Sequence, residues 1–460
     1  MAFVFAFGAP GASAAESLRV TNAAVGPAGL QLEWESSETA NAFVVQYQDA
    51  LSDGLWRTPS EFGPFPSSAL SWTDPGTTNA SRFYRVEAVP ASARGNVVAA
   101  NLVVSYNTAT LAFLFAAAGV PIVPQYNVRL YRIVYETVTP DGRKTTASGA
   151  FCVPEAASAV TLPLVSYQHG TITQTNKAPS SMDITTEAAV GVAFATSGYA
   201  AVVPDYLGLG QSAGLHPYHH ARSEATACVD MLRAAVRFSA TNGISVTNRV
   251  FLCGYSQGGH ATLALLRELE WFHAGEFTVG ACAPMAGAYD LSGVTANDFL
   301  SSRPKPNPYY FLYLLGAYQE TYHLAPSLAD LLAPPYNTTL PPLLNGNVSG
   351  SQINAAMPPN PLLILKPAYL AEFQSNPRHP LRLALENNDV YRWRPAAPLR
   401  FYHCDGDQDV VVTNTQTAVA YLHSIGRSDV TWENPVPGGG HGDCSQPSML
   451  RAKLWFDSLK

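Results

Sequence analysis

One stretch decides the fold of this chain, Val250-Phe251-Leu252-Cys253-Gly254-Tyr255-Ser256-Gln257-Gly258-Gly259-His260. Its first four residues are apolar and predict a buried strand, and residues 261–269 predict a helix. Gly-x-Ser-x-Gly between a strand and a helix is the setting of a nucleophile elbow. A Cβ at either flanking glycine would crowd the strand or the helix beside it. We therefore expect Ser256 to present its hydroxyl as a nucleophile, with the Gln257 N–H as an oxyanion donor.

The composition limits the kind of protein that the chain can be. It has 460 residues, of which 47% are hydrophobic and 13% are charged, and its net charge is −7. This length predicts two domains, or one large domain with an insertion. The low charge and acidic balance provide no basic surface for a nucleic acid. No apolar run approaches the roughly 20 residues of a transmembrane helix.

The first 15 residues are predicted to be the remnant of a signal peptide. Phe3–Phe7 is apolar, and Ala12-Ser13-Ala14 fits the small-residue pattern of a cleavage site. This interpretation predicts a secreted or periplasmic protein. An apolar extension without a targeting role is the alternative.

Residues 16–101 have an all-β pattern. Leu30–Trp34, Phe43–Tyr47 and Phe83–Val89 alternate in polarity, with turn residues between them. Leu30-x-Leu32-x-Trp34 and the later Phe83-Tyr84-Arg85-Val86 resemble a fibronectin type III module, which implies a small β-sandwich. An irregular N-terminal extension of the main domain is the alternative.

Residues 102–460 alternate between strands and helices. Val128–Val138 and Lys144–Val153 predict a hairpin closed by Pro140-Asp141-Gly142. Short apolar runs and helical segments then follow one another, which predicts an α/β fold with a mostly parallel sheet covered on both faces. The expected short strands are residues 162–168, 200–204, 250–253, 280–284 and 399–403, and the expected helices are residues 224–239 and 259–273.

Residues 296–394 interrupt this alternation. Aromatic residues crowd Tyr309-Tyr310-Phe311-Leu312-Tyr313, and proline-rich links follow. Because a structureless loop of this length is unusual in a compact domain, we predict a helical cap inserted over the site. Tyr309, Tyr310 and Phe311 are then candidate substrate-binding residues. A subdomain that packs only on the sheet edge is the alternative.

A serine nucleophile needs a base and an acid that orients the base. His441 lies in a glycine-rich loop after an expected strand at residues 430–432 and is the candidate base. The run after residue 403 contains Asp405, Asp407 and Asp409, and the spacing Gly-x-x-Asp-x-Val selects Asp409 as the acid. The resulting order Ser…Asp…His is that of α/β-hydrolases.

A second oxyanion donor is expected in the loop after residue 168. The N–H of Gly170 or Thr171 would face the elbow, and His169 is interpreted as a residue that shapes the loop. The nearby group of His216, His219 and His220 has weak zinc spacing and no convincing fourth ligand. We therefore predict no metal site.

Cys404 and Cys444 lie close in sequence to the candidate acid and base. Bringing Asp409 and His441 together would bring these two cysteines within reach of each other, so we predict a disulfide between them. Two free thiols beside the site are the alternative. Cys228, Cys253 and Cys282 are interpreted as core thiols.

Four motifs, in order, resemble the secretory lipases related to Candida lipase A, including their bacterial members. They are Tyr167-Gln168-His169-Gly170-Thr171, Val203-Pro204-Asp205-Tyr206-Leu207-Gly208-Leu209-Gly210, Gly254-Tyr255-Ser256-Gln257-Gly258-Gly259-His260 and Gly287-Ala288-Tyr289-Asp290-Leu291-Ser292-Gly293. The resemblance covers about residues 127–460. It implies an α/β-hydrolase fold, a cap after the sixth strand and carboxylic-ester hydrolysis.

The same resemblance assigns roles to individual residues. It implies a triad of Ser256, Asp409 and His441, with an oxyanion hole built from the Gln257 amide and the Gly170–Thr171 amides. The motif residues Tyr206 and Tyr255 are further candidates for substrate binding. The cysteine placement also resembles, locally, the bridge between acid loop and histidine loop in some polyester hydrolases.

The leading hypothesis is a secreted carboxylic-ester hydrolase, a lipase or esterase that needs no cofactor, with polyesters among its candidate substrates. A serine peptidase of the prolyl-oligopeptidase kind shares the triad order, but the chain has no N-terminal region long enough for a β-propeller. A non-catalytic binding protein on a hydrolase scaffold is the third hypothesis.

Overall fold

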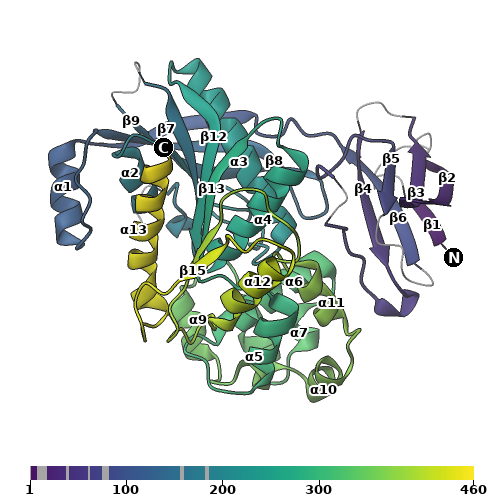
Figure 1. The fold of residues 1–460 in the computed structure, drawn as a ribbon. Helices are drawn as coiled ribbons and strands as arrows, with labels where there is room; N and C mark the ends of the chain where they lie inside the picture. Colours follow the sequence, from purple (N-terminus) through teal and green to yellow (C-terminus); the bar gives the residue numbers. More distant parts are fainter. Residues whose placement is uncertain are drawn as a thin grey trace.

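The computed structural model describes residues 2–7, 18–37, 41–60, 63–74, 82–155, 160–181 and 186–460. A small group of N-terminal strands lies beside a larger body of strands and helices (Figure 1). The expected cleavage site at residues 12–14 lies outside the described residues. Ala2–Phe7 forms strand β1, which pairs in parallel with β6 (Arg82–Pro90).

The described N-terminal residues form two three-stranded sheets. One has the order β1-β6-β4 and the other β2-β3-β5. Their remaining strands are β2 (Arg19–Gly26), β3 (Gly29–Glu35), β4 (Asn41–Gln48) and β5 (Ser71–Asp74). Leu32, Trp34, Val45 and Tyr84 are buried in one shared core because alternate side chains of each strand face the same side. The fibronectin type III likeness of this region remains a prediction.

The body is built on a sheet that has nine strands among the described residues, in the order β15-β14-β13-β12-β10-β11-β9-β8-β7. The five pairings from β11 to β15 are parallel, and the three from β7 to β11 are antiparallel. The strands are β7 (Val97–Tyr106), β8 (Val128–Val138), β9 (Lys144–Pro154), β10 (Leu162–Gln168), β11 (Ala200–Pro204), β12 (Val246–Tyr255), β13 (Thr278–Met285), β14 (Arg400–Tyr402) and β15 (Thr431–Glu433). All five residues of β11 are buried, as expected for a strand covered on both faces.

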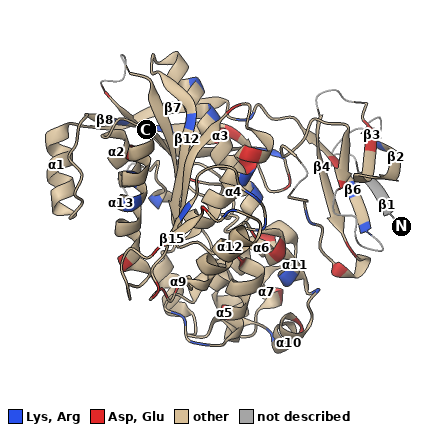
Figure 2. Ribbon diagram, in the orientation of Figure 1, with Lys and Arg blue, Asp and Glu red and all other residues tan. Residues whose placement is uncertain are grey.

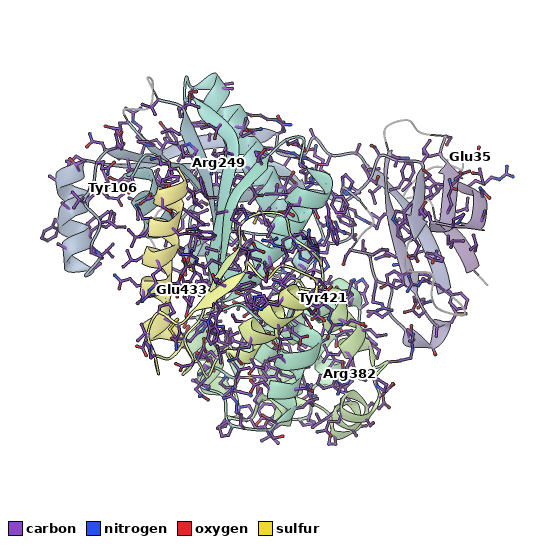
Figure 3. The ribbon with its side chains drawn as sticks, in the orientation of Figure 1. Glu35, Tyr106, Arg249, Arg382, Tyr421 and Glu433 are labelled. Carbon is purple, nitrogen blue, oxygen red and sulfur yellow. A yellow bond between two sulfur atoms is a disulfide. The ribbon has the colours of Figure 1, made fainter. Side chains whose placement is uncertain are left out.

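Helices cover both faces of this sheet and create two apolar cores (Figure 1). One face carries α3 (Ala221–Thr241), α4 (Gln257–Phe272) and α12 (Thr413–Ser424). The other carries α1 (Thr108–Ala117), α2 (Thr186–Ala195) and α13 (His441–Leu459). Side chains fill the space between these layers; the labelled Arg249 and Glu433 mark β12 and β15 (Figure 3). This arrangement brings the start of α4 and the start of α13 to the same end of the sheet.

The segment between β13 and β14 is helical. It contains α5 (Ala296–Leu300), α6 (Tyr309–Tyr322), α7 (Leu328–Leu331), α8 (Tyr336–Thr339), α9 (Gly350–Ala356), α10 (Pro367–Ser375) and α11 (Pro380–Asn387). We call this segment the cap. It has its own apolar core, in which Phe311, Leu315 and Tyr318 are almost fully buried. Leu55, from the segment between β4 and β5, is part of the same core.

The expected boundary between residues 101 and 102 is wrong, because it falls inside strand β7, which pairs with β8 along its whole length. The apolar run that continues past residue 101 keeps the chain in the sheet. The N-terminal region also contacts the body beyond β7. Arg222 of α3 donates to the carbonyl oxygens of Pro59 and Ser60 at 2.9 and 2.8 Å, and Arg378 of the cap pairs with the buried Asp53.

Charged residues are scattered over both parts of the molecule, and α1 carries none (Figure 2). Within the described residues, none of the helices is both long and apolar enough to cross a bilayer.

Candidate active site

Ser256 occupies a sharp turn between β12 and α4. Its φ angle is 61°, in the left-handed region that a serine rarely adopts, and such strain is typical of functional positions. Glycines make the turn possible. A Cβ on Gly254 would lie 2.4 Å from the Gly258 carbonyl oxygen, and one on Gly258 would lie 1.9 Å from the Gln168 carbonyl oxygen. The sequence pattern around Ser256 therefore has a steric basis.

His441 joins Ser256 to a carboxylate. Its Nε2 lies 2.9 Å from Ser256 Oγ, and its Nδ1 lies 2.5 Å from Asp407 Oδ2. Burial alone would raise the pKa of Asp407, but hydrogen bonds from His403 and His441 outweigh it and hold this pKa well below its usual range. Asp407 is thus an acceptor for the Nδ1 proton of His441, which leaves Nε2 free to accept the Ser256 proton.

The prediction of Asp409 as the carboxylate beside His441 is wrong. The N–H groups of Asp409 and Val410 both donate to Asp407 Oδ1 at 2.9 Å, so the chain turns tightly around the Asp407 carboxylate. This turn directs Asp409 toward the cap, where its two oxygens accept from Asn307 Nδ2 at 3.0 and 3.1 Å. Asp405 is exposed and accepts from the Gly438 N–H.

The predicted disulfide between Cys404 and Cys444 is present. Their Cα atoms are 5.8 Å apart, within the usual range for such a bond. It connects the loop that carries Asp407 to the first turn of α13, which carries His441. Cys228, Cys253 and Cys282 are free and buried, as expected for core thiols.

Two of the predicted oxyanion donors, Gln257 and Gly170, lie next to Ser256. As the first residue of α4, Gln257 has an N–H without a partner inside the helix. A Cβ placed on Gly170 would be 3.9 Å from Ser256 Cβ, so this loop passes close to the nucleophile. Thr171 bonds through Oγ1 to the Tyr218 hydroxyl at 2.8 Å. His169 contacts the carbonyl oxygens of Gly170 and Asp205, which fits its interpretation as a residue that shapes the loop.

A buried polar network behind the elbow was missed by the sequence analysis. Gln257 Nε2 donates to Glu224 Oε1 at 2.7 Å and contacts His216 Nε2 at 2.6 Å, and His260 Nδ1 lies 2.9 Å from Glu224 Oε2. Burial would raise the pKa of Glu224, but attraction and hydrogen bonding from His260 and Gln257 lower it to about 2. This carboxylate links α3 to the residue that follows Ser256.

His219, Glu224 and His260 each offer a ligand atom, and these atoms lie within 4.8 Å of one another. Both ring nitrogens of His260 already have partners, Glu224 and the Asn388 carbonyl oxygen. Glu224 also accepts from Gln257. Glu224 and His260 therefore belong to a hydrogen-bonded network, and the His219 ring packs against the His260 ring with centroids 4.7 Å apart.

Ser256 opens into a narrow cavity of about 50 Å³ beneath the cap. Leu291, Phe299 and Leu314 give it apolar walls, and Lys305, Asn307 and Asp409 gather in its polar part. Of the predicted substrate-binding residues, only Tyr310 lines this cavity.

The other four predicted substrate-binding residues have different surroundings. The prediction that Phe311 contacts substrate is wrong, because Phe311 packs against Phe299 in the cap core and does not line the cavity. Tyr206 is buried below the loop, with its hydroxyl donating to the His169 carbonyl oxygen. Tyr309 lies against Tyr310 with ring centroids 4.4 Å apart. The Tyr255 hydroxyl donates to the His441 carbonyl oxygen at 2.5 Å, so Tyr255 holds the histidine loop.

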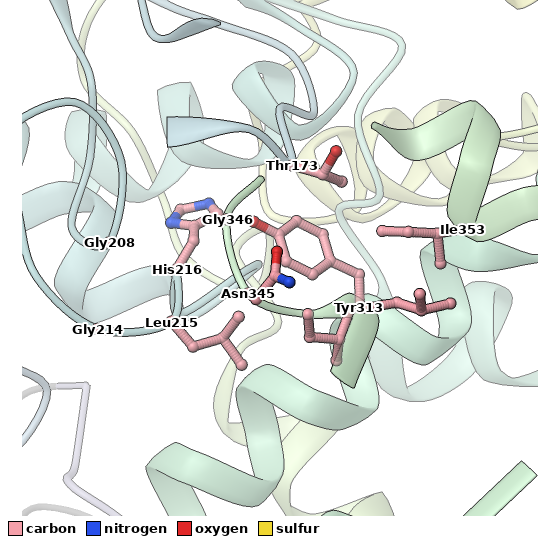
Figure 4. Close-up of a pocket in the computed structure, with 11 residues that line it drawn as sticks. Thr173, Gly208, Gly214, Leu215, His216, Tyr313, Asn345, Gly346 and Ile353 are labelled. Carbon is pink, nitrogen blue, oxygen red and sulfur yellow. The ribbon is translucent and has the colours of Figure 1, made fainter. Parts of the chain in front are cut away.

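A second cavity, of about 260 Å³, lies between the cap and the loop at residues 208–216 (Figure 4). His216, Tyr313 and Asn345 are among its lining residues. Ser256, Asp407 and His441 are not among them. It is larger than the Ser256 cavity, but the candidate chemistry lies in the smaller one.

Known proteins match this arrangement. The model of the secretory lipase family matches residues 173–281. A putative hydrolase from Legionella pneumophila is similar with a TM-score of 0.73 and 26% identity, covering 79% of this chain and 98% of that chain. The rice cell wall degrading esterase LipA from Xanthomonas oryzae is similar with a TM-score of 0.68 and 29% identity, covering 80% of this chain and 96% of that chain.

Candida antarctica lipase A in its closed state has a TM-score of 0.58 and 18% identity, covering 80% of this chain and 83% of that chain; this likeness concerns the fold alone. No curated protein matches the chain. The structural neighbours and the mostly parallel sheet confirm an α/β-hydrolase fold for the body. Together with the family match, they support a hydrolase of the lipase or esterase class.

Proposed function

We propose that this protein is a secreted carboxylic-ester hydrolase whose triad is Ser256, His441 and Asp407. The observation that carries the proposal is the continuous hydrogen-bonded chain from Ser256 Oγ through the His441 ring to Asp407 Oδ2, at 2.9 and 2.5 Å. This is the donor–acceptor order that a serine nucleophile requires. The esterase and lipase neighbours support the same reaction class.

In the proposed mechanism, His441 Nε2 takes the Ser256 proton as Oγ attacks the ester carbonyl carbon. Asp407 accepts the Nδ1–H and stabilises the imidazolium that forms. The amides of Gln257 and of Gly170 or Thr171 bind the oxyanion of the tetrahedral intermediate. The imidazolium then protonates the leaving alcohol, and a water molecule activated by His441 releases the acid from the acyl-enzyme. The chemistry needs no cofactor.

The size of the Ser256 cavity favours esters with short acyl chains. A cavity of about 50 Å³ cannot enclose a long acyl chain without movement of the cap. Leu291, Phe299 and Leu314 would bury the methylenes of the acyl chain. Each buried methylene would contribute about 0.8 kcal/mol to the free energy of binding. Polymeric esters stay candidate substrates, because a chain end needs only one ester group to reach Ser256.

Export is part of the proposal. The secretory lipase match and the Cys404–Cys444 disulfide support an extracytoplasmic location. The disulfide is the type of bond that persists in oxidising surroundings.

The test is hydrolysis of 4-nitrophenyl butyrate by the wild type and by Ser256→Ala. We expect turnover by the wild type and a loss of at least a thousandfold in the variant, with an unchanged circular dichroism spectrum. A fluorophosphonate should label Ser256 covalently in the wild type alone. Cleavage of a Gly-Pro amide in preference to the ester would favour the peptidase hypothesis, and no turnover of either would favour a binding protein.

A further inference from the structure

Asp409 is unused by the proposed triad, yet it lines the same cavity as Ser256. Its side chain is half-buried, and its two oxygens share a single amide donor, Asn307 Nδ2. A carboxylate can accept about four hydrogen bonds. Asp409 therefore keeps acceptor capacity beside the nucleophile.

The position of Asp409 is fixed from two sides. From its own loop, its N–H is held by Asp407 Oδ1. From the cap, Asn307 binds its carboxylate, while Arg303 donates to the carbonyl oxygen of the preceding Gln408 at 2.9 Å. A carboxylate held in this way is organised before a ligand arrives, which reduces the entropic cost of binding.

The nearby cations share one carboxylate. Lys305 contacts Asp298 Oδ2 at 2.7 Å, and Arg303 binds the same carboxylate at 2.7 Å. His219, the histidine in the cavity wall, is neutral near pH 7, because burial lowers its pKa to about 3. Among the described residues, no cation contacts Asp409 directly, and the Lys305–Arg303–Asp298 group leaves one positive charge in its neighbourhood, so the remaining acceptor sites of Asp409 are open to a neutral donor.

We propose that Asp409 accepts a hydrogen bond from a hydroxyl group of the bound ester, with Asn307 as its partner in recognition. The enzyme would then prefer hydroxylated short-chain esters over their deoxy counterparts. This inference rests on the proposed ester hydrolysis and makes Asp409 a specificity-determining residue of that site.

A hydroxyl fits the polar part of this cavity better than a cation does. A hydroxyl both donates and accepts, and this part of the cavity offers a carboxylate acceptor as well as the Lys305 ammonium and the Asn307 amide. A cationic ligand would have to approach Lys305, whose Nζ lies 5.7 Å from the Phe299 ring centroid and covers an aromatic face that could otherwise bind a cation.

The experiment compares kcat/KM for three esters that differ by hydroxyl groups. Propyl butyrate is the reference, 2,3-dihydroxypropyl butyrate carries hydroxyls on the alcohol, and propyl 3-hydroxybutyrate carries one on the acyl group. We expect the wild type to prefer at least one hydroxylated ester about tenfold, the usual size of a hydrogen bond to a charged group. Which of the two is preferred identifies the side of the ester that meets Asp409.

The variant Asp409→Asn keeps the shape of the side chain. In this variant the ratio of kcat/KM for the preferred hydroxylated ester to kcat/KM for propyl butyrate should fall about tenfold, to a value near one. Asp405→Asn is the matched control, because Asp405 lies on the same loop, is exposed and does not line the cavity; it should retain the wild-type ratio. If Asp409→Asn does not fold, Asn307→Ala tests the same pair and should also reduce the ratio.

Three results would overturn the inference. They are a wild type without preference among the three esters, equal losses for all three in Asp409→Asn, and a stronger preference for a choline ester than for either hydroxylated ester. Failure of the wild type to hydrolyse propyl butyrate and 4-nitrophenyl butyrate would instead reject the proposed function itself.

Discussion

The two halves of the candidate triad are held in place by different means. Ser256 stands on a tightly packed turn, where the backbone atoms nearest to a Cβ added at Gly254 or Gly258 lie 2.4 and 1.9 Å away. The segments that carry His441 and Asp407 are packed less evenly: a Cβ on Gly406, directly before Asp407, would lie 2.4 Å from the Gly438 carbonyl oxygen. Gly442, directly after His441, has no heavy atom within 4 Å of an added Cβ. The nucleophile is fixed by packing, whereas His441 has an open position beside it and is tied to the Asp407 loop by a disulfide and a hydrogen bond.

This difference shows that rigidity at an active site need not come from dense packing everywhere. The elbow is part of the sheet core and shares its stability. Asp407 and the Cys404–Cys444 disulfide are buried as well, and the start of α13 depends on that disulfide and on the His441–Asp407 hydrogen bond for its position relative to the acid loop. Substitutions should therefore damage the two halves in different ways.

The largest effect is expected for Asp407→Asn. The amide cannot accept the Nδ1–H of His441 in the required orientation when its NH₂ group faces the ring, so the imidazole adopts the wrong tautomer. We predict a loss in kcat of about 10⁴, as found for loss of the acid in other triads. Stopped-flow or steady-state assays with 4-nitrophenyl butyrate measure kcat. An Asp405→Asn variant that is equally slow would show that the exposed carboxylate, and not Asp407, orients the base.

The second-largest effect is expected when the Cys404–Cys444 disulfide is removed. Cys404→Ala together with Cys444→Ala should lower the free energy of unfolding by about 2–4 kcal/mol, because the bond closes a loop with a sequence separation of 40. The half-life of activity at raised temperature should shorten accordingly. Reductant should shorten the half-life of the wild type and leave that of the double variant unchanged. Equal half-lives without reductant would mean that hydrogen bonds alone hold the histidine loop.

Gly258→Ala tests the tightly packed turn that carries Ser256. The new Cβ would lie 1.9 Å from the Gln168 carbonyl oxygen, and backbone cannot move aside as a flexible side chain can. We predict a cost of about 1–3 kcal/mol in the free energy of unfolding. Turnover of the folded fraction should also fall, because the elbow must shift. Denaturant unfolding and active-site titration separate these two effects. A variant with wild-type values in both would contradict a tightly packed elbow.

The smallest effect is expected for Gly442→Ala, the counterpart at the open start of α13. The position is open and lies in the first turn of α13, so alanine should be neutral or stabilise the protein by up to about 1 kcal/mol through its helix propensity. Turnover should stay within twofold of the wild type. A loss comparable with that of Gly258→Ala would remove the distinction between the two halves.

The elbow could be predicted from the sequence because its requirements are local. Gly254, Ser256 and Gly258 are needed within a few residues, and a strand and a helix flank them. The strands of the body could be predicted equally well, because a strand covered on both faces is an uninterrupted apolar run in the sequence. His441 was identifiable because few histidines lie in a glycine-rich loop after a late strand.

The acid could not be fixed in the same way. Asp405, Asp407 and Asp409 alternate along one short run, and local spacing does not distinguish them. The choice depends on a turn in which Asp407 accepts two backbone N–H groups, together with His403 and His441. The Glu224 network was missed for a related reason, because its members come from α3, α4 and the loop that carries His216.

The four free cysteines carry a consequence for how the chain folds and oxidises. Six cysteines allow fifteen single pairs, and the native protein uses one of them. Cys152, Cys228, Cys253 and Cys282 are all buried within the sheet and α3, and burial raises the pKa of each thiol, so little reactive thiolate forms once the core has closed. Oxidation before closure would trap these thiols in wrong pairs. The order of maturation therefore matters: the sheet must assemble first, and oxidation of the two loop cysteines should come last.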